Sequence, residues 1–338
     1  MKTIKLLSAL AAVAMMVGCA APDEDYTSKV NPKIGSGGHG HVFVGANAPF
    51  GMTQVGPTSI TQEWDWCSGY HDSENSVIGF SHTHLSGTGC GDLFDVTLMP
   101  VTGEVTYGRG RLGDYSAGFW SEADRTQEVV EPGYYSVPLT RYNILAEMTA
   151  TERGGLHRYT FPASDEAAII LDLVHGGCFD RPEDLFAEAV SDTRVVGRRH
   201  SWGWSNNQKV YFVIEFSKPF DKFEPIGENG FYYRIHFKTE EGEQIGVKVA
   251  LSSTSPAGAE LNFSTEVKDK DFDTVRKETR AKWQNELRKI RIYGATEEQN
   301  EIFYTGMYHM YVAPSLFSDV DGTYRGADNE IHENPGYH

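Results

Sequence analysis

The amino-acid sequence predicts a mainly β protein, an N-terminal antiparallel β-sandwich followed by helices. Residues 95–263 consist of short stretches rich in β-branched and aromatic residues, which turn signals such as Pro132-Gly133 separate. No helical spacing interrupts these stretches, which favours an antiparallel sandwich. The aromatic content of 12% suits broad sheet faces. After residue 270 the spacing of apolar residues changes to that of a helix.

The first residues are typical of an export signal. Lys2 and Lys5 precede an apolar run, Leu6–Gly18, that is too short to span a bilayer. The run ends in Met16-Val17-Gly18-Cys19, which resembles a bacterial lipobox, so we expect residues 1–18 to be a lipoprotein signal peptide and Cys19 to be lipidated. An ordinary secretory peptide cleaved among the alanines at 20 and 21 is the alternative. Either signal exports the chain.

We therefore expect an exported bacterial lipoprotein with a lipid anchor to the membrane, in the periplasm, the outer membrane or at the cell surface. Residues 19–29 would be its tether. Loss of two lysines with the signal lowers the formal charge from −17 to −19. Such a charge repels nucleic acid and anionic membranes, so we expect no nucleic-acid partner, whereas neutral sugars feel no repulsion. Three cysteines remain (Cys67, Cys90 and Cys178), and whether Cys67 and Cys90 form a disulfide stays open.

Two helices are predicted near the end of the chain. The first covers residues 271–292 in a linker at 269–294, because apolar side chains recur there every three or four residues. The second begins at Thr296, which forms a capping-box pattern with Gln299, and Pro314 ends it. Its apolar face, residues 302–311, needs partners that the sequence does not supply. We therefore expect the chain to end early in a helical domain.

Glycine, histidine and tryptophan crowd together between residues 31 and 95. The segment reads NPKIGSGGHGHVFVGANAPFGMTQVGPTSI, then WDWCSGYH, then IGFSHTHLSGTGCGDLFD. Glycine costs about 1 kcal/mol per position inside a helix, so this composition suits tight turns close to a ligand. In this order, the three strings resemble the N-terminal region of glycoside hydrolase family 92, the calcium-dependent α-mannosidases.

The resemblance implies a β-sandwich at residues 30–268, a helical linker, and the start of a truncated (α/α)6 barrel at 295–338, where FYTGMYHMYVAPSLFSDVDGTYRGAD looks like the barrel's opening. It also implies an inverting α-mannosidase, most simply of the α-1,2 type, that removes terminal mannose from glycans. Inverting enzymes use two carboxyl groups about 6.5–9.5 Å apart. In the family these groups and the main calcium ligands belong to later motifs. We therefore assign no catalytic residue and no metal ligand, and we expect this chain alone to be inactive.

Several residues are nonetheless expected to contact carbohydrate. Trp64 and Trp66 flank Asp65, and in a strand the two indoles would face the same way and form the wall of a sugar pocket. Phe50 and Gly51, in APFGM, match a family motif that approaches the bound mannose, where glycine would let a backbone amide reach a hydroxyl. Asp328, in YRGAD, matches a position that bonds mannose hydroxyls. The alternatives are core tryptophans, a plain turn and a structural aspartate.

Two His-x-His pairs, His39-Gly40-His41 and His82-Thr83-His84, could each present two imidazoles on one face. We expect hydrogen-bonded histidines at the domain interface. Two other functions stay open. A metallohydrolase would use both pairs to bind a transition metal. A non-catalytic carbohydrate-binding sandwich would bind mannosides without cleaving them.

Overall fold

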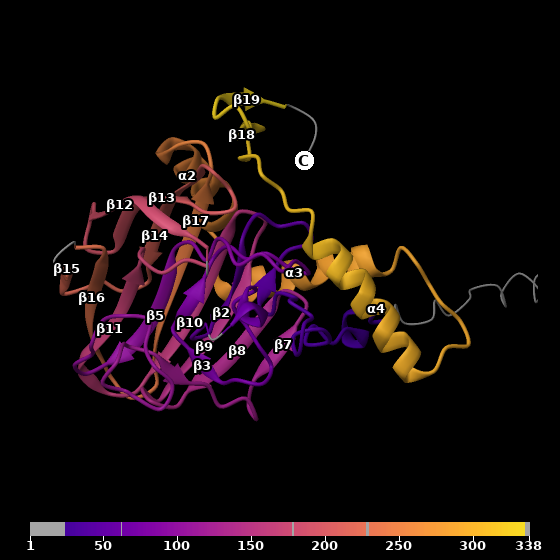
Figure 1. Cartoon of the computed structure of the whole chain (residues 1–338), viewed down its shortest axis with the longest axis horizontal. Coiled ribbons are helices and arrows are strands. Elements are labelled where there is room, and N and C mark those ends of the chain that lie inside the picture. The colour runs from indigo at the N-terminus through magenta and orange to yellow at the C-terminus, as the bar shows by residue number, and fades with distance from the viewer. Residues whose placement is uncertain (1–23, 62, 178, 228–229, 335–338) are drawn as a thin grey trace, which may run out of the picture.

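Two antiparallel β-sheets packed face to face make up most of the protein (Figure 1). The computed structural model describes residues 24–61, 63–177, 179–227 and 230–334. The predicted signal peptide, Cys19 and Cys178 lie outside these ranges. The prediction of a β-sandwich followed by helices is confirmed.

The first sheet has seven strands and the second has eight. The order across the first sheet is β1 (Ala46–Asn47), β2 (Gln54–Thr58), β4 (Gly79–Ser81), β5 (Thr97–Thr102), β11 (Ser164–Asp172), β16 (Tyr232–Thr239) and β15 (Lys222–Ile226). The order across the second is β12 (Arg181–Ala189), β13 (Arg194–Trp202), β14 (Gln208–Phe216), β17 (Glu243–Ser252), β10 (Gly154–Phe161), β9 (Ile144–Ala150), β8 (Tyr134–Leu139) and β7 (Val129–Glu131). A small separate sheet pairs β3 (Ser76–Val77) with β6 (Ser121–Glu122).

The main core lies between the two large sheets, and it follows from the alternation of side chains along each strand. In β17, for example, Ile245, Val247 and Val249 are buried, whereas Lys248 between them is only partly covered. Burying an aliphatic side chain of this size contributes about 1.5–3 kcal/mol. A shift of one residue would turn this apolar set outward, so the alternation fixes the register of the strand.

Two short helical segments cover the outer face of the eight-stranded sheet. Helix α2 (Pro256–Asn262) and the π-helical turn η4 (Phe263–Val267) pack on it through a second apolar cluster. The sequence predicts strands to residue 263 and a sandwich to 268, but the last strand of the two large sheets ends at Ser252. The side chain of Ser255 caps α2, accepting from the Gly258 amide at 3.0 Å, and proline follows at the first helical position. Both are helix-start signals that outweigh the local β texture.

Helix α3 (Phe272–Leu287) is the first predicted helix. Asp271 caps it, accepting from the Thr274 amide at 2.8 Å. The helix buries the predicted stripe, which contains Val275, Thr279, Trp283 and Leu287. It ends five residues before the predicted limit at 292, and Ile290, expected on the same stripe, is 49% exposed.

Helix α4 (Glu297–Val312) begins at the predicted capping box, where Thr296 and Gln299 each accept from the other's backbone amide. The expectation that its apolar face lacks partners is partly wrong. Tyr304 and Tyr308 are fully buried against α3 and the start of the described chain. Ile302 and Met310, on the other face, are exposed.

Residues 24–29 supply part of this packing, although the sequence analysis placed them in a tether. They include the short helix η2 (Thr27–Lys29). Tyr26 is buried, and its amide donates to Gln284 Oε1 at 2.8 Å. Asp25 accepts from Arg280 at 2.7 Å. The segment is thus fastened to α3.

The chain returns to the sandwich after α4. Asp319 is fully buried and accepts from Asn262 Nδ2 at 2.7 Å, from Ser252 Oγ at 2.7 Å and from Thr254 Oγ1. Beyond it, β18 (Thr323–Arg325) and β19 (Ile331–Glu333) form a hairpin beside α2 (Figure 1). Asp319 therefore anchors the base of the hairpin. Within the described ranges, no helix is long and apolar enough to cross a bilayer.

Candidate functional site

The loop of residues 35–42 presents two histidines to one carboxylate. Gly40 packs against the carbonyl of Gly35, where a Cβ atom would lie 1.8 Å from the oxygen, so only glycine fits. His41 has a φ of +55°, which is uncommon for a residue with a side chain. Asp65 Oδ1 lies 2.7 Å from His39 Nδ1 and 3.0 Å from His41 Nε2. We name these three residues the histidine–aspartate cluster.

The cluster lies at the protein surface. The His39 side chain is 80% exposed, whereas that of His41 is only 5% exposed. Hydrogen bonds from His39 and His41 lower the pKa of Asp65, because they stabilise its charged form. Asp65 is therefore a carboxylate at neutral pH.

Trp64 stands beside the cluster with its ring half in solvent. The side chain is 51% exposed, its Nε1 donates to the Gly89 carbonyl at 2.7 Å, and its ring meets the His41 ring edge-on at 4.2 Å. A Cβ atom on Gly89 would lie 2.3 Å from the indole, so only glycine at this position allows the ring to pack this closely. The indole is thus held rigidly while one part of it stays exposed.

The predicted strand around Trp64 and Trp66 is wrong. Residues Trp64–Trp66 form the 3₁₀ turn η3. A 3₁₀ turn rotates about 120° per residue, so residues two apart do not share a face. Trp66 accordingly stacks on His71, with ring centroids 4.2 Å apart and planes 22° apart. Only Trp64 is offered as an open aromatic wall.

Phe50 and Gly51 lie where the sandwich meets the end of α4. Phe50 is 36% exposed, and its amide donates to the Tyr311 carbonyl at 2.7 Å. It lines a cleft of about 700 Å³ together with Glu152, Arg153, Glu266, Pro314 and Leu316. The Gly51 amide donates to the Ala48 carbonyl at 3.0 Å. That amide is therefore already occupied by a turn.

Asp328 lies in the connection between β18 and β19, and the residue is exposed. Its carboxylate lies 2.9 and 3.0 Å from His332 Nε2. Lys209 Nζ donates to Asn329 Oδ1 at 3.1 Å, and Arg325 Nε donates to the Ser253 carbonyl at 2.8 Å. These bonds fasten the hairpin to the start of β14 and to the residue that follows β17. The predicted contacts thus occupy three segments: η3, the loop between β1 and β2 where it meets the end of α4, and the hairpin.

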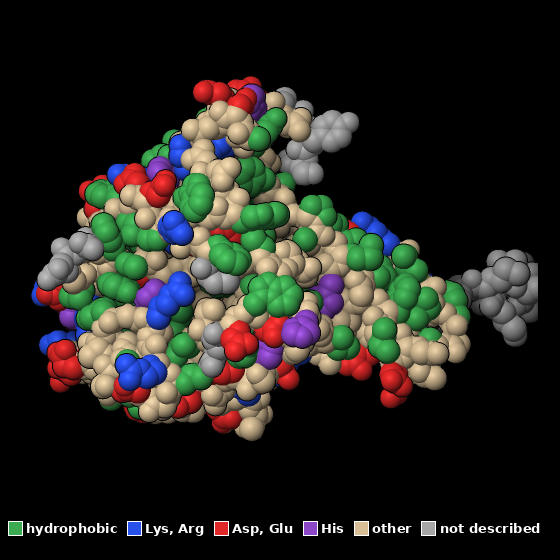
Figure 2. All heavy atoms as spheres, viewed as in Figure 1, with side chains coloured by type: hydrophobic (Ala, Val, Ile, Leu, Met, Phe, Trp, Pro, Cys, Tyr) green, Lys and Arg blue, Asp and Glu red, His purple; other side chains and the backbone are tan. Residues whose placement is uncertain are grey.

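Figure 2 shows hydrophobic side chains on the face between the hairpin and α4, with histidine and acidic side chains among them. This mixture of apolar surface with a few hydrogen-bonding groups suits a carbohydrate, which has apolar C–H faces and polar edges.

The second histidine pair has no part in this surface. His82 and His84 are buried, and burial lowers the pKa of each to about 4. His82 Nδ1 donates to the Val96 carbonyl at 2.5 Å, and His84 Nδ1 donates to the Gln54 carbonyl at 2.8 Å. The structure does not bring the two His-x-His pairs to one point, so a hydrolase that uses both pairs is not supported.

A buried ion triad supports the loops beside the site, and the sequence analysis missed it. Arg199 is fully buried; its Nη1 donates to Asp95 Oδ1 at 2.6 Å and its Nη2 donates to Asp180. Asp95 also accepts from Thr83 Oγ1 at 2.7 Å. The triad joins β13 to the segments after β4 and β11. Sequence separations of 104 and 19 residues gave no local signal for it.

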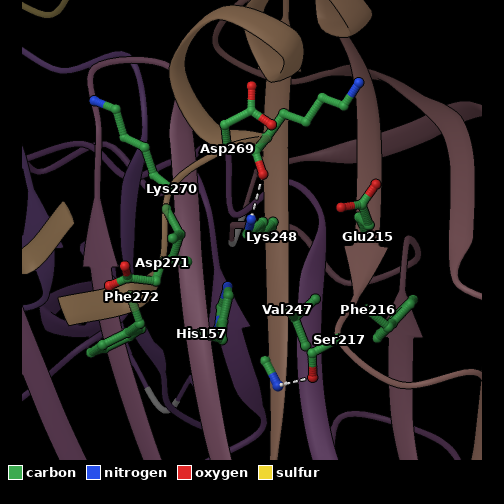
Figure 3. A pocket seen from close by; sticks show the side chains of 13 residues that line it. His157, Glu215, Phe216, Ser217, Val247, Lys248, Asp269, Lys270, Asp271 and Phe272 are labelled. Atoms are coloured by element: carbon green, nitrogen blue, oxygen red, sulfur yellow. Dashed lines mark hydrogen bonds between the residues drawn. The ribbon is translucent and has the colours of Figure 1, made fainter. Parts of the chain in front are cut away.

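A further cavity of about 490 Å³ lies on the outer face of the eight-stranded sheet (Figure 3). Lys248 Nζ donates across it to the Lys268 carbonyl at 2.6 Å, and Glu215 and Asp269 stand near by. None of the residues predicted to bind carbohydrate lines it. Its rim carries charges of both signs.

Calcium, which the family resemblance implies, prefers six to eight oxygen ligands. Within the described ranges, the histidine–aspartate cluster is the only group of three or more His, Cys, Asp or Glu side chains close enough to share an ion. Two ring nitrogens and one carboxylate do not fit calcium. We assign no calcium ligand.

Comparison with protein families decides the relationship of the chain. The model of the glycosyl hydrolase family 92 N-terminal domain matches residues 29–252, and that of the family 92 catalytic domain matches residues 258–338. The chain belongs to glycoside hydrolase family 92. The border between the two matches falls between β17 and α2, so α2 and η4 go with the family's catalytic part.

Solved structures agree with this membership. A family 92 α-mannosidase from Bacteroides thetaiotaomicron, determined with mannoimidazole, is 34% identical, with a TM-score of 0.87 over 93% of this chain and 43% of that one. A family 92 inverting mannosidase from the same organism, 22% identical with a TM-score of 0.77 over 93% and 44%, shares the fold. An uncharacterized secreted glycosidase of Arthroderma benhamiae is 23% identical over 87% of this chain and 42% of its own length. The family 92 chain thus spans less than half the length of these relatives.

Proposed function

We propose that this family 92 chain forms one wall of the mannose-binding cleft of an α-mannosidase that removes terminal mannose from glycans. The observation that carries the proposal is the half-exposed indole of Trp64, held rigidly beside Asp65. The relative that is 34% identical was determined with mannoimidazole, a mannose-like ligand, which supports mannose as the sugar.

The chemistry of the wall suits a pyranose. An indole face packs well on the C–H groups of a sugar ring. Asp65 uses Oδ1 for both imidazoles, and among the described residues none donates to its Oδ2, which leaves that atom to accept from a sugar hydroxyl. Trp64 and Asp65 would thus bind one apolar face and one polar edge of the same ring.

The other two segments would complete the wall. Phe50 offers a partly exposed ring in the cleft at the end of α4, and Gly51, lacking a side chain, allows close approach. The Gly51 amide bonds Ala48, so it would not reach the sugar itself. Asp328 would accept from mannose hydroxyls, and Trp66, stacked on His71, would support the turn rather than touch the ligand.

Catalysis would need groups that this sequence does not show. More than half of each relative's length has no counterpart in the 338 residues. We propose that the acid and base of an inverting reaction, and the calcium ligands, belong to that part. The α-1,2 linkage, export and the lipid anchor at Cys19 are proposals of the same kind, supported by the WDWCSGYH string and the N-terminal run.

The test compares binding with cleavage. We expect saturation-transfer NMR to detect mannoimidazole on the purified chain, and we expect no mannose to be released from α-1,2-mannobiose. If the chain does not bind mannoimidazole at millimolar concentration, the proposal that it forms a wall of the mannose cleft is wrong. If the pure chain releases mannose, the proposed location of the acid and base is wrong. The match of residues 258–338 to the catalytic domain favours an enzyme over a free-standing binding module.

A further inference from the structure

We propose that His39, His41 and Asp65 form a transition-metal site of the zinc type that fastens the glycine-rich loop to the turn η3. Its donors are two imidazoles and one carboxylate, whereas calcium prefers oxygen ligands alone. The site does not depend on the proposed binding of mannose.

The geometry of the three donors carries this proposal. Asp65 Oδ1 lies 2.7 Å from His39 Nδ1 and 3.0 Å from His41 Nε2, and the ligand atoms of all three residues lie within 4.8 Å of one another. In a tetrahedral zinc site, metal–ligand bonds of about 2.0–2.2 Å place neighbouring ligand atoms about 3.3 Å apart. To reach this spacing, the two contacts of Asp65 would lengthen by about 0.3–0.6 Å, and the widest separation in the cluster would shorten by up to about 1.5 Å.

The kinds of donor match the metal. Two imidazoles and one carboxylate are a common set of three protein ligands for zinc, and they leave a fourth position for water. The exposure of the His39 side chain, 80%, gives an ion a path from solvent. Among the three side chains of the cluster, only Asp65 offers the oxygen ligands that calcium prefers.

The backbone is shaped for this convergence. Gly40 can pack on the Gly35 carbonyl only because it has no Cβ, and His41 has a positive φ. Backbone conformations of this kind cost free energy and occur most often where a function needs them. The loop thereby directs Nδ1 of His39 and Nε2 of His41 toward the same oxygen, Asp65 Oδ1.

A metal here would act on Trp64. The Trp64 ring packs against the His41 ring, with ring centroids 4.2 Å apart, and Trp64 directly precedes Asp65 in the sequence. An ion that joins His41 to Asp65 would hold both neighbours of the indole at once. The loop of residues 35–42 and η3 would then move as one unit.

The experiment measures metal binding directly. The full 338-residue chain, prepared without a histidine tag and stripped with a chelator, is titrated with Zn²⁺, Co²⁺ and Ca²⁺. We expect one Zn²⁺ per chain, intense d–d absorption of Co²⁺ in four-coordinate geometry, a higher melting temperature with Zn²⁺, and no response to Ca²⁺. His39→Ala and Asp65→Asn should each weaken Zn²⁺ binding more than about tenfold. Mutating residues that only hydrogen-bond to a metal ligand already lowers metal affinity by about 10–100-fold.

A matched control is His236→Ala, which removes an imidazole paired with one carboxylate, Glu224, at 3.1 Å and should leave Zn²⁺ binding unchanged. Because the His39 side chain is exposed, we expect His39→Ala to stay folded, and circular dichroism checks this. No Zn²⁺ bound by the unmodified chain would overturn the proposal. Equal Zn²⁺ affinity of His39→Ala and His236→Ala would show that Zn²⁺ binds surface histidines in general. That result would also overturn the proposal.

Discussion

The Nε2 atoms of His82 and His157 lie 2.9 Å apart inside the sandwich. His82 Nδ1 donates to the Val96 carbonyl, so neutral His82 must accept at Nε2, and His157 Nε2 must donate to it. His157 Nδ1 then accepts from the Tyr159 hydroxyl at 2.8 Å. Burial lowers the pKa of both rings and so keeps them neutral, and with neutral rings these contacts set the order of donors.

From the burial of His82 and His157 we expect the protein to lose stability in mild acid. Burial lowers the pKa of His82 to about 4 and holds that of His157 well below its usual range, whereas an unfolded histidine titrates near 6.5. Between pH 6.5 and 4 the unfolded state binds protons that the folded state excludes. The free energy of unfolding should therefore fall as the pH falls through this window, by about 3 kcal/mol for His82 alone.

Urea denaturation at pH 7, 5.5 and 4.5 measures this slope. His82→Gln should lower the free energy of unfolding at pH 7 but make it depend less on pH, because glutamine takes up no proton in the unfolded state. Parallel curves for the two proteins would show that His82 is not the source of the acid sensitivity.

Arg199 predicts a large effect of a single charge. Arg199→Met leaves Asp95 and Asp180 buried without their cation, which should lower the free energy of unfolding by about 3–5 kcal/mol. The adjacent Arg198 pairs with Asp184 near the surface, so Arg198→Met should cost less than about 1 kcal/mol. Chemical denaturation compares the two. Similar losses would mean that the triad adds nothing beyond an ordinary surface pair.

Trp64 predicts a loss of binding without a loss of fold. Trp64→Ala removes a half-exposed ring, so we expect mannoimidazole to bind roughly tenfold more weakly, the effect of about 1.4 kcal/mol of lost contact. The melting temperature should change little. Trp204→Ala, at a side chain 75% exposed on another loop, is the matched control. Equal effects of the two substitutions on binding would count against the wall at η3.

Asp319 predicts a local loosening. Asp319→Ala leaves the Asn262 amide and the Ser252 hydroxyl without their acceptor, at a cost of about 3 kcal/mol. Limited proteolysis should then cut within residues 313–322 faster than in the unmodified chain. Asp321→Asn, two residues away and part of a local turn with Thr323, should leave the cutting rate unchanged. Resistance of the Asp319 variant would show that other contacts hold the segment.

Features set by neighbours in the sequence were predictable. The spacing of Val275, Thr279 and Trp283 located α3, and the capping pattern at Thr296 located the first turn of α4, because both depend on residues three or four apart. The same local reasoning failed at Trp64 and Trp66, since alternating aromatics fit either a strand or a tight turn.

Features set by residues far apart in the sequence were not predictable. His82 and His157 are 75 residues apart, and Asp95 and Arg199 are 104 apart, so only the sheet topology joins them. The glycines and histidines of residues 35–42 marked a site, but no pattern showed that Asp65 would meet both imidazoles. The sequence therefore indicated a candidate region, and the contacts between its side chains came only from the structure.

The bond from Trp64 Nε1 to the Gly89 carbonyl uses the only polar atom of the indole. What the ring offers outward is hydrocarbon, which forms no hydrogen bond to a sugar hydroxyl. If this surface prefers mannose to its epimers through hydrogen bonds, those bonds must come from charged or amide groups around the indole. Exchanging those groups should then alter which hexose is bound while the stacking surface stays the same.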